Sequence, residues 1–308
     1  MGKIIVVGTL AFDTIETPFG KVERVLGGSA PFASLAAKTQ DVECAIISIV
    51  GNDFPKSYLD LFVSKEIDIS EVQIEKSGKS FFWSGKYHEN MNKRDTLETQ
   101  VNVLSDFDPK LPLKFLDTDV LVLGNLDPKV QLSVLNQFDD SPHFIMLDTM
   151  NFWMDNNLED LNEVISKVNL ISINDEEAYL LAKEKSLDGC AHKIIKKGPK
   201  YVIIKKGELG AELHSKDEKF SMPSFRTEAV DPTGAGDSFA GGVATYLSKT
   251  NSIDFNSIKK GLILGTILAS FTVEGLGTKS IEKVVKKKIL DRLEKFIIKN
   301  KFDLNLSI

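Results

Sequence analysis

Short apolar runs alternate along the chain with segments whose apolar residues recur at helical spacing. The apolar runs that we expect to form strands are 3–8, 44–50, 119–124, 143–148, 169–173 and 201–206, with 211–214 and 218–222 as a hairpin. The segments with helical spacing are 30–39, 54–66, 129–138, 158–167, 176–184, 188–197, 236–249, 256–273 and 280–299. Strands that alternate with helices are typical of βαβ units. We therefore predict an α/β fold with a doubly wound, mostly parallel sheet covered by helices on both faces.

Two segments, 13–26 and 72–104, do not follow this alternation. The first contains Pro18 and Gly20, and the second contains the aromatic run Phe81–Tyr87 followed by mixed alternation. We expect both to form a small β-sheet outside the parallel sheet, inserted in a single domain of residues 1–308. Because ligands of such folds bind beyond the carboxyl ends of the strands, the small sheet is expected to act as a lid there or as a dimer surface.

Charge and composition narrow the classes of partner. The chain has 38 Lys and Arg against 44 Asp and Glu, a net charge of −6, which argues against a nucleic acid or an anionic membrane. No run approaches the roughly 18 apolar residues of a membrane span, and the first apolar run is too short for a secretory signal. We expect a reducing, cytoplasmic location and no metal site of His and Cys. The residues concerned show neither pairing nor ligand spacing: Cys44, Cys190, His88, His143, His192 and His214.

The segment most informative about chemistry is Asp231-Pro232-Thr233-Gly234-Ala235-Gly236-Asp237, which opens a helical pattern. Its glycines allow successive N–H groups to point to one place at a helix N-terminus. Such an anion hole suits the charge on a phosphoryl group during transfer, and Asp237 beside it can accept the proton of an attacking hydroxyl. From the residues alone, the alternative is a glycine-rich turn in which Asp237 caps the helix.

This order of residues, with Phe239, Gly241 and Gly242 after it, closely resembles the signature of the ribokinase-like (PfkB) carbohydrate kinase family. The resemblance extends over essentially the whole chain. It implies a doubly wound fold with a small β-lid, a homodimer formed through that lid, and the use of ATP and Mg²⁺. It also implies phosphoryl transfer to a primary hydroxyl of a small-molecule sugar, with Asp237 as base and Gly234-Ala235-Gly236 as anion hole.

Residues near the N-terminus resemble the part of this family that binds the acceptor. Asp13 implies a contact with sugar hydroxyls, since a carboxylate can accept two adjacent O–H groups; taken alone, it reads as a turn residue. Gly27, Gly28 and Ser29 resemble a di-glycine where the backbone approaches the substrate, although a tight turn with Ser29 as helix cap explains them equally well. Where the family commonly has a substrate-binding Asn, this chain has Phe32, whose ring suits stacking or an apolar wall.

Two later turns resemble the nucleotide and metal site of the family. Asn174 and Glu177 imply contacts with Mg²⁺ and phosphate, largely through water, while the same spacing is a helix capping box. Gly207 and Gly210 match the nucleotide-binding turn, and Lys205 before them implies a phosphate contact, with solvent exposure as the alternative.

The resemblance further implies a monovalent cation such as K⁺ at Asp231, near the loop 274–279. The acceptor itself stays open. A base-stacking pocket would suit a nucleoside, so a nucleoside kinase is the first alternative; its aromatic residues would be Phe32, Phe82, Trp83 and Tyr87. A sugar-acid acceptor is disfavoured because residues 148–152 lack an Arg that would bind its carboxylate. The alternative from another class is a catalytically silent protein that senses a sugar or a nucleotide.

Overall fold

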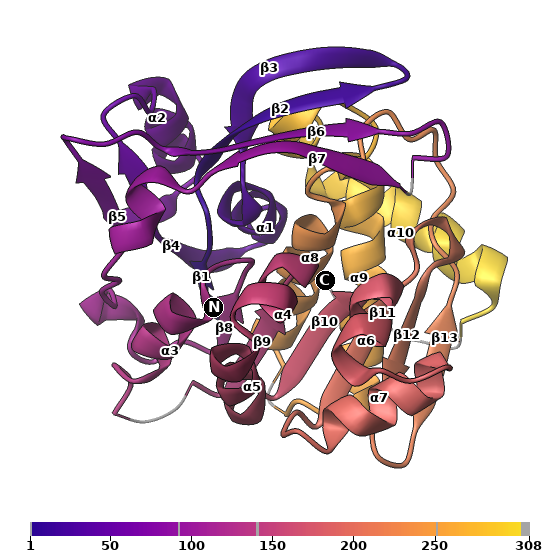
Figure 1. Cartoon of the computed structure of the whole chain (residues 1–308). Helices are drawn as coiled ribbons and strands as arrows, with labels where there is room; N and C mark the ends of the chain where they lie inside the picture. The colour runs from indigo at the N-terminus through magenta and orange to yellow at the C-terminus, as the bar shows by residue number, and fades with distance from the viewer. Residues whose placement is uncertain (1, 92, 140–141, 251, 303–308) are drawn as a thin grey trace.

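The computed structural model describes residues 2–91, 93–139, 142–250 and 252–302. Its large sheet has nine strands, shown in Figure 1. In order across the sheet they are β13 (Lys219–Met222), β12 (Ala211–His214), β11 (Tyr201–Lys205), β10 (Leu170–Asn174), β9 (Phe144–Asp148), β8 (Val120–Leu123), β1 (Gly2–Val7), β4 (Val42–Gly51) and β5 (Ile67–Glu75). All neighbouring pairs are parallel except β11–β12 and β12–β13. The prediction of a mostly parallel sheet with a terminal hairpin is confirmed.

The interior strand β1 shows why a continuous apolar run folds in this way. It pairs with β4 along one edge and with β8 along the other. Successive side chains of a strand point to opposite faces. Ile4 and Val6 accordingly belong to one hydrophobic cluster and Ile5 and Val7 to the other. The sheet is therefore buried on both faces.

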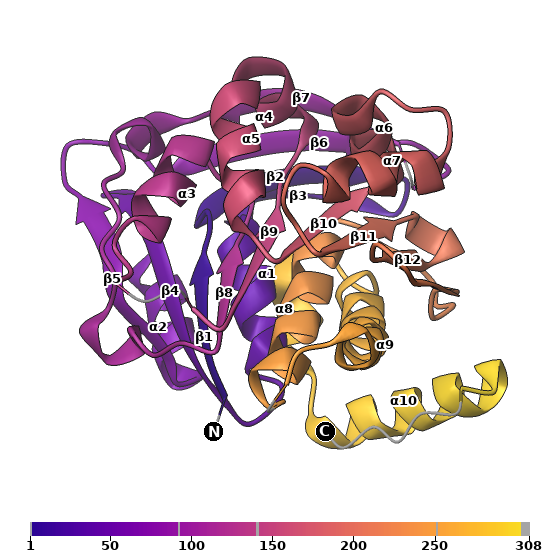
Figure 2. The same cartoon turned by 90° about the horizontal axis from the view of Figure 1, so that it is seen from below.

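Helices form these two clusters with the sheet (Figures 1 and 2). On one face lie α1 (Ser29–Ala37), α2 (Lys56–Ser64), α8 (Ala235–Ser248), α9 (Phe255–Thr272) and α10 (Lys286–Asn300). On the other lie α3 (Pro128–Leu135), α4 (Asn151–Asn156), α5 (Leu158–Lys167), α6 (Asp175–Ala182) and α7 (Leu187–Ile195). Short 3₁₀ helices cover Asn102–Asp106, Leu113–Phe115, Gly207–Leu209, Gly277–Lys279 and Ile281–Lys283. The doubly wound architecture is confirmed, although α4 was not predicted and α10 begins at Lys286 instead of near residue 280.

A separate sheet of four strands crosses one end of the molecule, at the top of Figure 1. Its order is β3 (Gly20–Gly27), β2 (Ala11–Thr17), β6 (Phe81–Tyr87) and β7 (Arg94–Gln100). The assignment of residues 72–75 to this sheet was wrong, because they continue β5, which pairs in parallel with β4. As a half-buried edge strand, β5 has a mixed polar pattern like that of the small sheet. Asn92, within the predicted segment 72–104, lies outside the described residues.

Among the described residues, no single helix has the length and apolar composition needed to cross a membrane. The helix α9 passes that test only together with Gly277–Lys283, as a pair bent by 119°.

Candidate active site

The Asp231–Asp237 segment leads into α8, whose N-cap is Gly234 in the left-handed conformation at φ 75°. No side chain caps this end of α8 in the described chain. The first N–H groups of a helix have no partner within the helix, and they attract anions. Asp237 lies in the first turn and is half-buried. It does not cap the helix, in contrast to the alternative considered from the sequence.

Phe32 of α1 lies directly beneath Gly234. A Cβ atom at position 234 would stand 2.3 Å from the nearest ring carbon of Phe32. The Phe32 ring is 1% exposed, so it can neither stack on a ligand nor form the wall of an open pocket. The prediction of stacking or an apolar wall at Phe32 was therefore wrong. The ring instead supports the turn that precedes α8.

Asp13 is on β2 and faces Gly27, the last residue of β3, and Gly28, the N-cap of α1. The side chain is 4% exposed, and its Oδ2 accepts a hydrogen bond from the Gly28 N–H at 3.4 Å. A Cβ at Gly27 would lie 2.0 Å from that carboxylate, and Gly28 has a φ of 89° with its Cβ position 2.4 Å from the Thr9 carbonyl oxygen. Each glycine is thus required for this close approach.

Ser29 is the first residue of α1, and the N-cap is Gly28. The alternative in which Ser29 caps the helix is therefore wrong. Its N–H donates to Thr9 Oγ1 at 3.0 Å, and its own Oγ accepts from the Thr9 N–H at 3.1 Å. These reciprocal bonds join the end of β1 to α1, and they were not apparent from the sequence because 20 positions separate the two residues.

The carboxylates of the site influence one another. Burial raises the pKa of Asp13 to about 7, and the charges of Asp231 and Asp237 act in the same direction. Desolvation of the Asp237 carboxylate likewise raises its pKa to about 7, and the charge of Asp148 contributes in the same direction. The charges of Lys205 and Arg94 oppose this shift. Asp13 and Asp237 are 224 positions apart in the sequence. The fold brings them close enough for the charge of Asp237 to raise the pKa of Asp13. A cationic ligand or a metal would relieve this accumulation of negative charge.

Asn174 and Glu177 form a complete capping box at the start of α6. Asn174 Oδ1 accepts from the Glu177 N–H, and Glu177 Oε2 accepts from the Asn174 N–H, both at 2.8 Å. Burial raises the pKa of Glu177 to about 7, opposed chiefly by Lys205. One carboxylate oxygen, Oε1, makes no hydrogen bond within the described residues, so the capping role leaves an oxygen atom for another ligand.

Lys205, at the end of β11, lies among the carboxylates. Its Nζ is 2.5 Å from Asp148 Oδ2, and its side chain is 18% exposed. Burial lowers the pKa of Lys205, but Asp148, Glu177 and Asp237 outweigh it and leave the pKa above its usual value. A Cβ placed on Gly236 would lie 3.2 Å from the same Nζ. The ammonium group is thus enclosed next to the N-terminus of α8, unlike the solvent-exposed alternative.

The turn after Lys205 connects β11 to β12. Gly207 and Gly210 have φ angles of 54° and 97°, and the Lys206 N–H donates to the Gly210 carbonyl at 2.8 Å. At Gly210 a Cβ would lie 2.0 Å from the Met222 carbonyl oxygen. The glycines therefore let the hairpin fold tightly beside Lys205.

Two residues of the small sheet also reach this region: Tyr87, which the sequence suggested only for base stacking, and Arg94, which the sequence did not single out. Tyr87 is 5% exposed and its hydroxyl accepts a hydrogen bond from Thr233 Oγ1 at 3.2 Å. Arg94 pairs with Tyr87 in the β6–β7 register. Desolvation lowers the pKa of the Arg94 guanidinium. Interactions with Tyr87, Glu177 and Asp237 outweigh this effect and leave the pKa above its usual value. The small sheet thus contacts the Asp231–Asp237 segment.

Asp231 is 1% exposed and joins this segment to the loop that follows α9. Its Oδ1 accepts from the Thr233 N–H and its Oδ2 from the Gly277 N–H, each at 2.9 Å. A carboxylate has about four lone-pair positions, so two remain for a cation. Burial raises the pKa of Asp231 despite these two hydrogen bonds.

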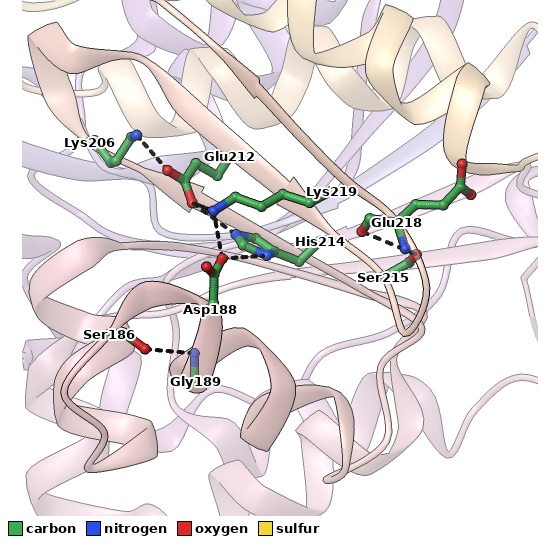
Figure 3. Close-up of polar contacts among 9 residues, drawn as sticks. All are labelled: Ser186, Asp188, Gly189, Lys206, Glu212, His214, Ser215, Glu218 and Lys219. Carbon is green, nitrogen blue, oxygen red and sulfur yellow. Dashed lines mark hydrogen bonds and ion pairs between the residues drawn. The ribbon is translucent and has the colours of Figure 1, made fainter.

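A second group of charged residues joins α7 to the β12–β13 hairpin (Figure 3). Ligand atoms of Asp188, Glu212 and His214 lie within 4.8 Å of one another, a grouping that the sequence spacing did not reveal. The Lys219 ammonium is already between the carboxylates, at 2.5 Å from Asp188 and 3.2 Å from Glu212. Lys206 binds the other Glu212 oxygen at 2.7 Å. The four charges balance, and we interpret the group as an ion-pair network that supports the hairpin.

Comparison with known proteins identifies the family. Residues 1–284 match the pfkB family carbohydrate kinase domain, so the chain belongs to that family. Cytidine kinase of Thermococcus kodakarensis is 28% identical over 259 residues, covering 82% of this chain and 91% of the relative.

Solved structures agree in fold. The nucleoside kinase of Methanocaldococcus jannaschii, an archaeal member of the ribokinase family, superposes with a TM-score of 0.77 at 22% identity, covering 96% of this chain and 99% of the other. A putative ribokinase II from E. coli, in complex with ATP and Mg²⁺, gives a TM-score of 0.79 at 17% identity, covering 96% and 100%. At these identities the structures establish the ribokinase-like fold. Together with the family match, the comparisons identify a kinase of sugars or nucleosides.

Proposed function

We propose that this kinase transfers the γ-phosphoryl group of ATP to a primary hydroxyl of a sugar or a nucleoside, with Asp237 as the base. The observation that carries the proposal is the position of Asp237. It is half-buried in the first turn of α8, whose N-terminus no side chain caps in the described chain. Its pKa of about 7 is close to neutral pH, where a general base is most effective.

In this mechanism, Asp13 and the Gly27–Ser29 backbone orient the acceptor so that its hydroxyl faces Asp237. Asp237 accepts the hydroxyl proton as the oxygen attacks the γ-phosphorus of ATP, and the bond from that phosphorus to the β–γ bridging oxygen breaks to release ADP. The Gly234–Asp237 amides and the α8 N-terminus hold the negative charge of the transferred group. Lys205 adds a positive charge on the side of Gly236, where its Nζ is enclosed.

Two features support a nucleotide and a divalent metal. The turn at Gly207 and Gly210 lies immediately after Lys205, and we assign the nucleotide to it together with Asn174. Glu177 keeps one carboxylate oxygen outside the capping box and would hold Mg²⁺ through water. The metal would neutralise charge between the phosphates. The structure of the E. coli relative with ATP and Mg²⁺ favours this pair of ligands.

Arg94 extends the proposal to the small sheet. Asp237 and Glu177 both raise the pKa of Arg94, so we infer that the small sheet acts as a lid that brings a second cation to the transferred phosphoryl group. An arginine in such a position stabilises charge during phosphoryl transfer.

Three further assignments concern a monovalent cation, the oligomeric state and the location of the protein. A K⁺ ion at Asp231 is consistent with the unused lone pairs of that carboxylate. We also infer a homodimer through the small sheet, whose β7 residues are all exposed, and a cytoplasmic location, in keeping with two buried, unpaired cysteines.

A nucleoside acceptor is favoured over a free sugar because the relative that matches 82% of this chain is a cytidine kinase. A panel of sugars and nucleosides with ATP and Mg²⁺, with ADP formation as the readout, tests the whole proposal. We expect one class of acceptor to stimulate ADP formation far above the level without acceptor. Saturable binding of panel members without any ADP formation would instead identify a catalytically silent sensor.

A further inference from the structure

A cavity of about 590 Å³ lies between α10 and the loop after α9, apart from the residues assigned to catalysis. Five cationic side chains line it against two acidic ones, on a chain whose net charge is −6. These residues are Lys279, Lys283, Lys288, Arg292 and Lys295, with Glu274 and Asp291. A local excess of one sign, opposite to that of the whole protein, attracts ligands of the other sign.

Arg292 forms the fixed wall of this cavity. Its guanidinium lies 3.6 Å from the Phe271 ring centroid and 4.8 Å from that of Phe225. It also donates to Ser270 Oγ and to Glu274 Oε1, both at 2.9 Å. The aromatic rings and the two hydrogen bonds therefore fix the guanidinium in one orientation. An anion that binds here does not have to offset the entropy cost of ordering the Arg292 side chain.

The four lysines are in a different situation. Within the part of the chain that the structure describes, no carboxylate, hydrogen-bond acceptor or aromatic ring pairs with their ammonium groups. Lys288 and Lys295 are seven positions apart on α10, on the same face and about 10.5 Å apart along the helix axis. Like charges that converge on one cavity repel each other until a counter-ion enters.

We propose that this cavity binds a small organic polyphosphate, a molecule with two or more phosphate groups. Its volume is within the range of sites for small ligands, and the spacing of the lysines suits more than one anionic group. The cavity borders the loop whose Gly277 N–H binds Asp231. A bound polyphosphate would therefore contact the loop that anchors the start of the Asp231–Asp237 segment.

Isothermal titration of the full chain with fructose 1,6-bisphosphate and with ADP, without divalent metal, tests this proposal. Because ADP also has the nucleotide site proposed at Gly207 and Gly210, binding of either ligand supports the proposal where K288E/K295E weakens that binding, and the two titrations distinguish a sugar bisphosphate from a nucleotide. Inorganic phosphate is expected to bind roughly tenfold or more weakly, because it spans fewer ammonium groups. The absence of binding by both polyphosphates would overturn the proposal.

The variant K288E/K295E should weaken binding by roughly tenfold or more. The variant K287E/K299E makes the same change of charge at exposed positions of α10 outside the cavity lining and should retain binding. Lys205→Met, which alters the active site, should also retain the binding of fructose 1,6-bisphosphate. Equal losses in the two double variants would show non-specific attraction, and a loss only in Lys205→Met would place the ligand in the active site. Either result would contradict a separate site.

Discussion

Replacing Gly234 by Ala tests how the turn before α8 is built. Two costs add at this position. A non-glycine residue at a φ of 75° costs about 1–2 kcal/mol. The new methyl group would also lie 2.3 Å from a ring carbon of Phe32, a side chain that is 1% exposed and packed in the core. Overpacking of this kind costs about 1–3 kcal/mol, so we expect a loss of about 2–5 kcal/mol in the free energy of unfolding.

Urea unfolding followed by circular dichroism measures this loss, and the companion variant Phe32→Leu separates the two costs. Because the smaller side chain removes the clash but not the strained φ, the double variant should lose less than the sum of the single variants, by about 1 kcal/mol or more. Gly236→Ala is the matched control. Its Cβ would meet only the flexible end of Lys205, at 3.2 Å, so its unfolding free energy should stay within about 1 kcal/mol of the original. A loss below about 1 kcal/mol for Gly234→Ala, or strict additivity with Phe32→Leu, would refute the packing argument.

Three further predictions concern the charged residues. Between about pH 4 and 7 the folded chain keeps a proton on Asp13 that the unfolded chain has released, so this group's contribution to stability falls as the pH rises. Asp13→Asn should therefore stabilise the fold by about 1–4 kcal/mol more at pH 8 than at pH 5 while raising the KM of the acceptor; equal effects on unfolding at both pH values would contradict this. Glu177→Gln should keep the capping box and raise the Mg²⁺ concentration needed for half-maximal activity, whereas Glu177→Ala should also lose about 1 kcal/mol in urea unfolding; an unchanged Mg²⁺ requirement in both would argue against a metal role. Lys205→Met should destabilise the fold by about 1–3 kcal/mol, because it leaves Asp148 unpaired, and it should also raise the KM for ATP. The double variant with Asp148→Asn should recover the stability but not the KM. Recovery of the KM as well would show that Lys205 acts only on Asp148.

The fold was predictable because its signals are local. Continuous apolar runs such as that of β1 require burial on both faces, and their alternation with helical patterns leaves few topologies. The exception at residues 72–75 has a physical reason. An edge strand buried on one side has the same mixed pattern as a strand of the small sheet, and only its pairing with β4 distinguishes the two.

In the candidate site, too, the features set by local sequence were predictable and those set by tertiary contacts were not. Asp237 and the capping box of Asn174 and Glu177 are contained in short segments, so their geometry follows from neighbouring residues. The position of Phe32 under Gly234 and that of Arg94 near Asp237 depend on tertiary packing and strand register. No spacing in the sequence expresses such contacts between distant segments.

The central claim is that Asp237 accepts the proton of the acceptor hydroxyl. The most direct measurement is the turnover of Asp237→Asn with the acceptor that the panel identifies, together with ATP binding by the same variant. The amide keeps the size of the side chain but cannot accept that proton. We predict a fall in turnover of about 10²–10⁴-fold, with ATP affinity close to that of the original chain. Near-native turnover, or a loss of ATP binding that accounts for the lost activity, would contradict this mechanism.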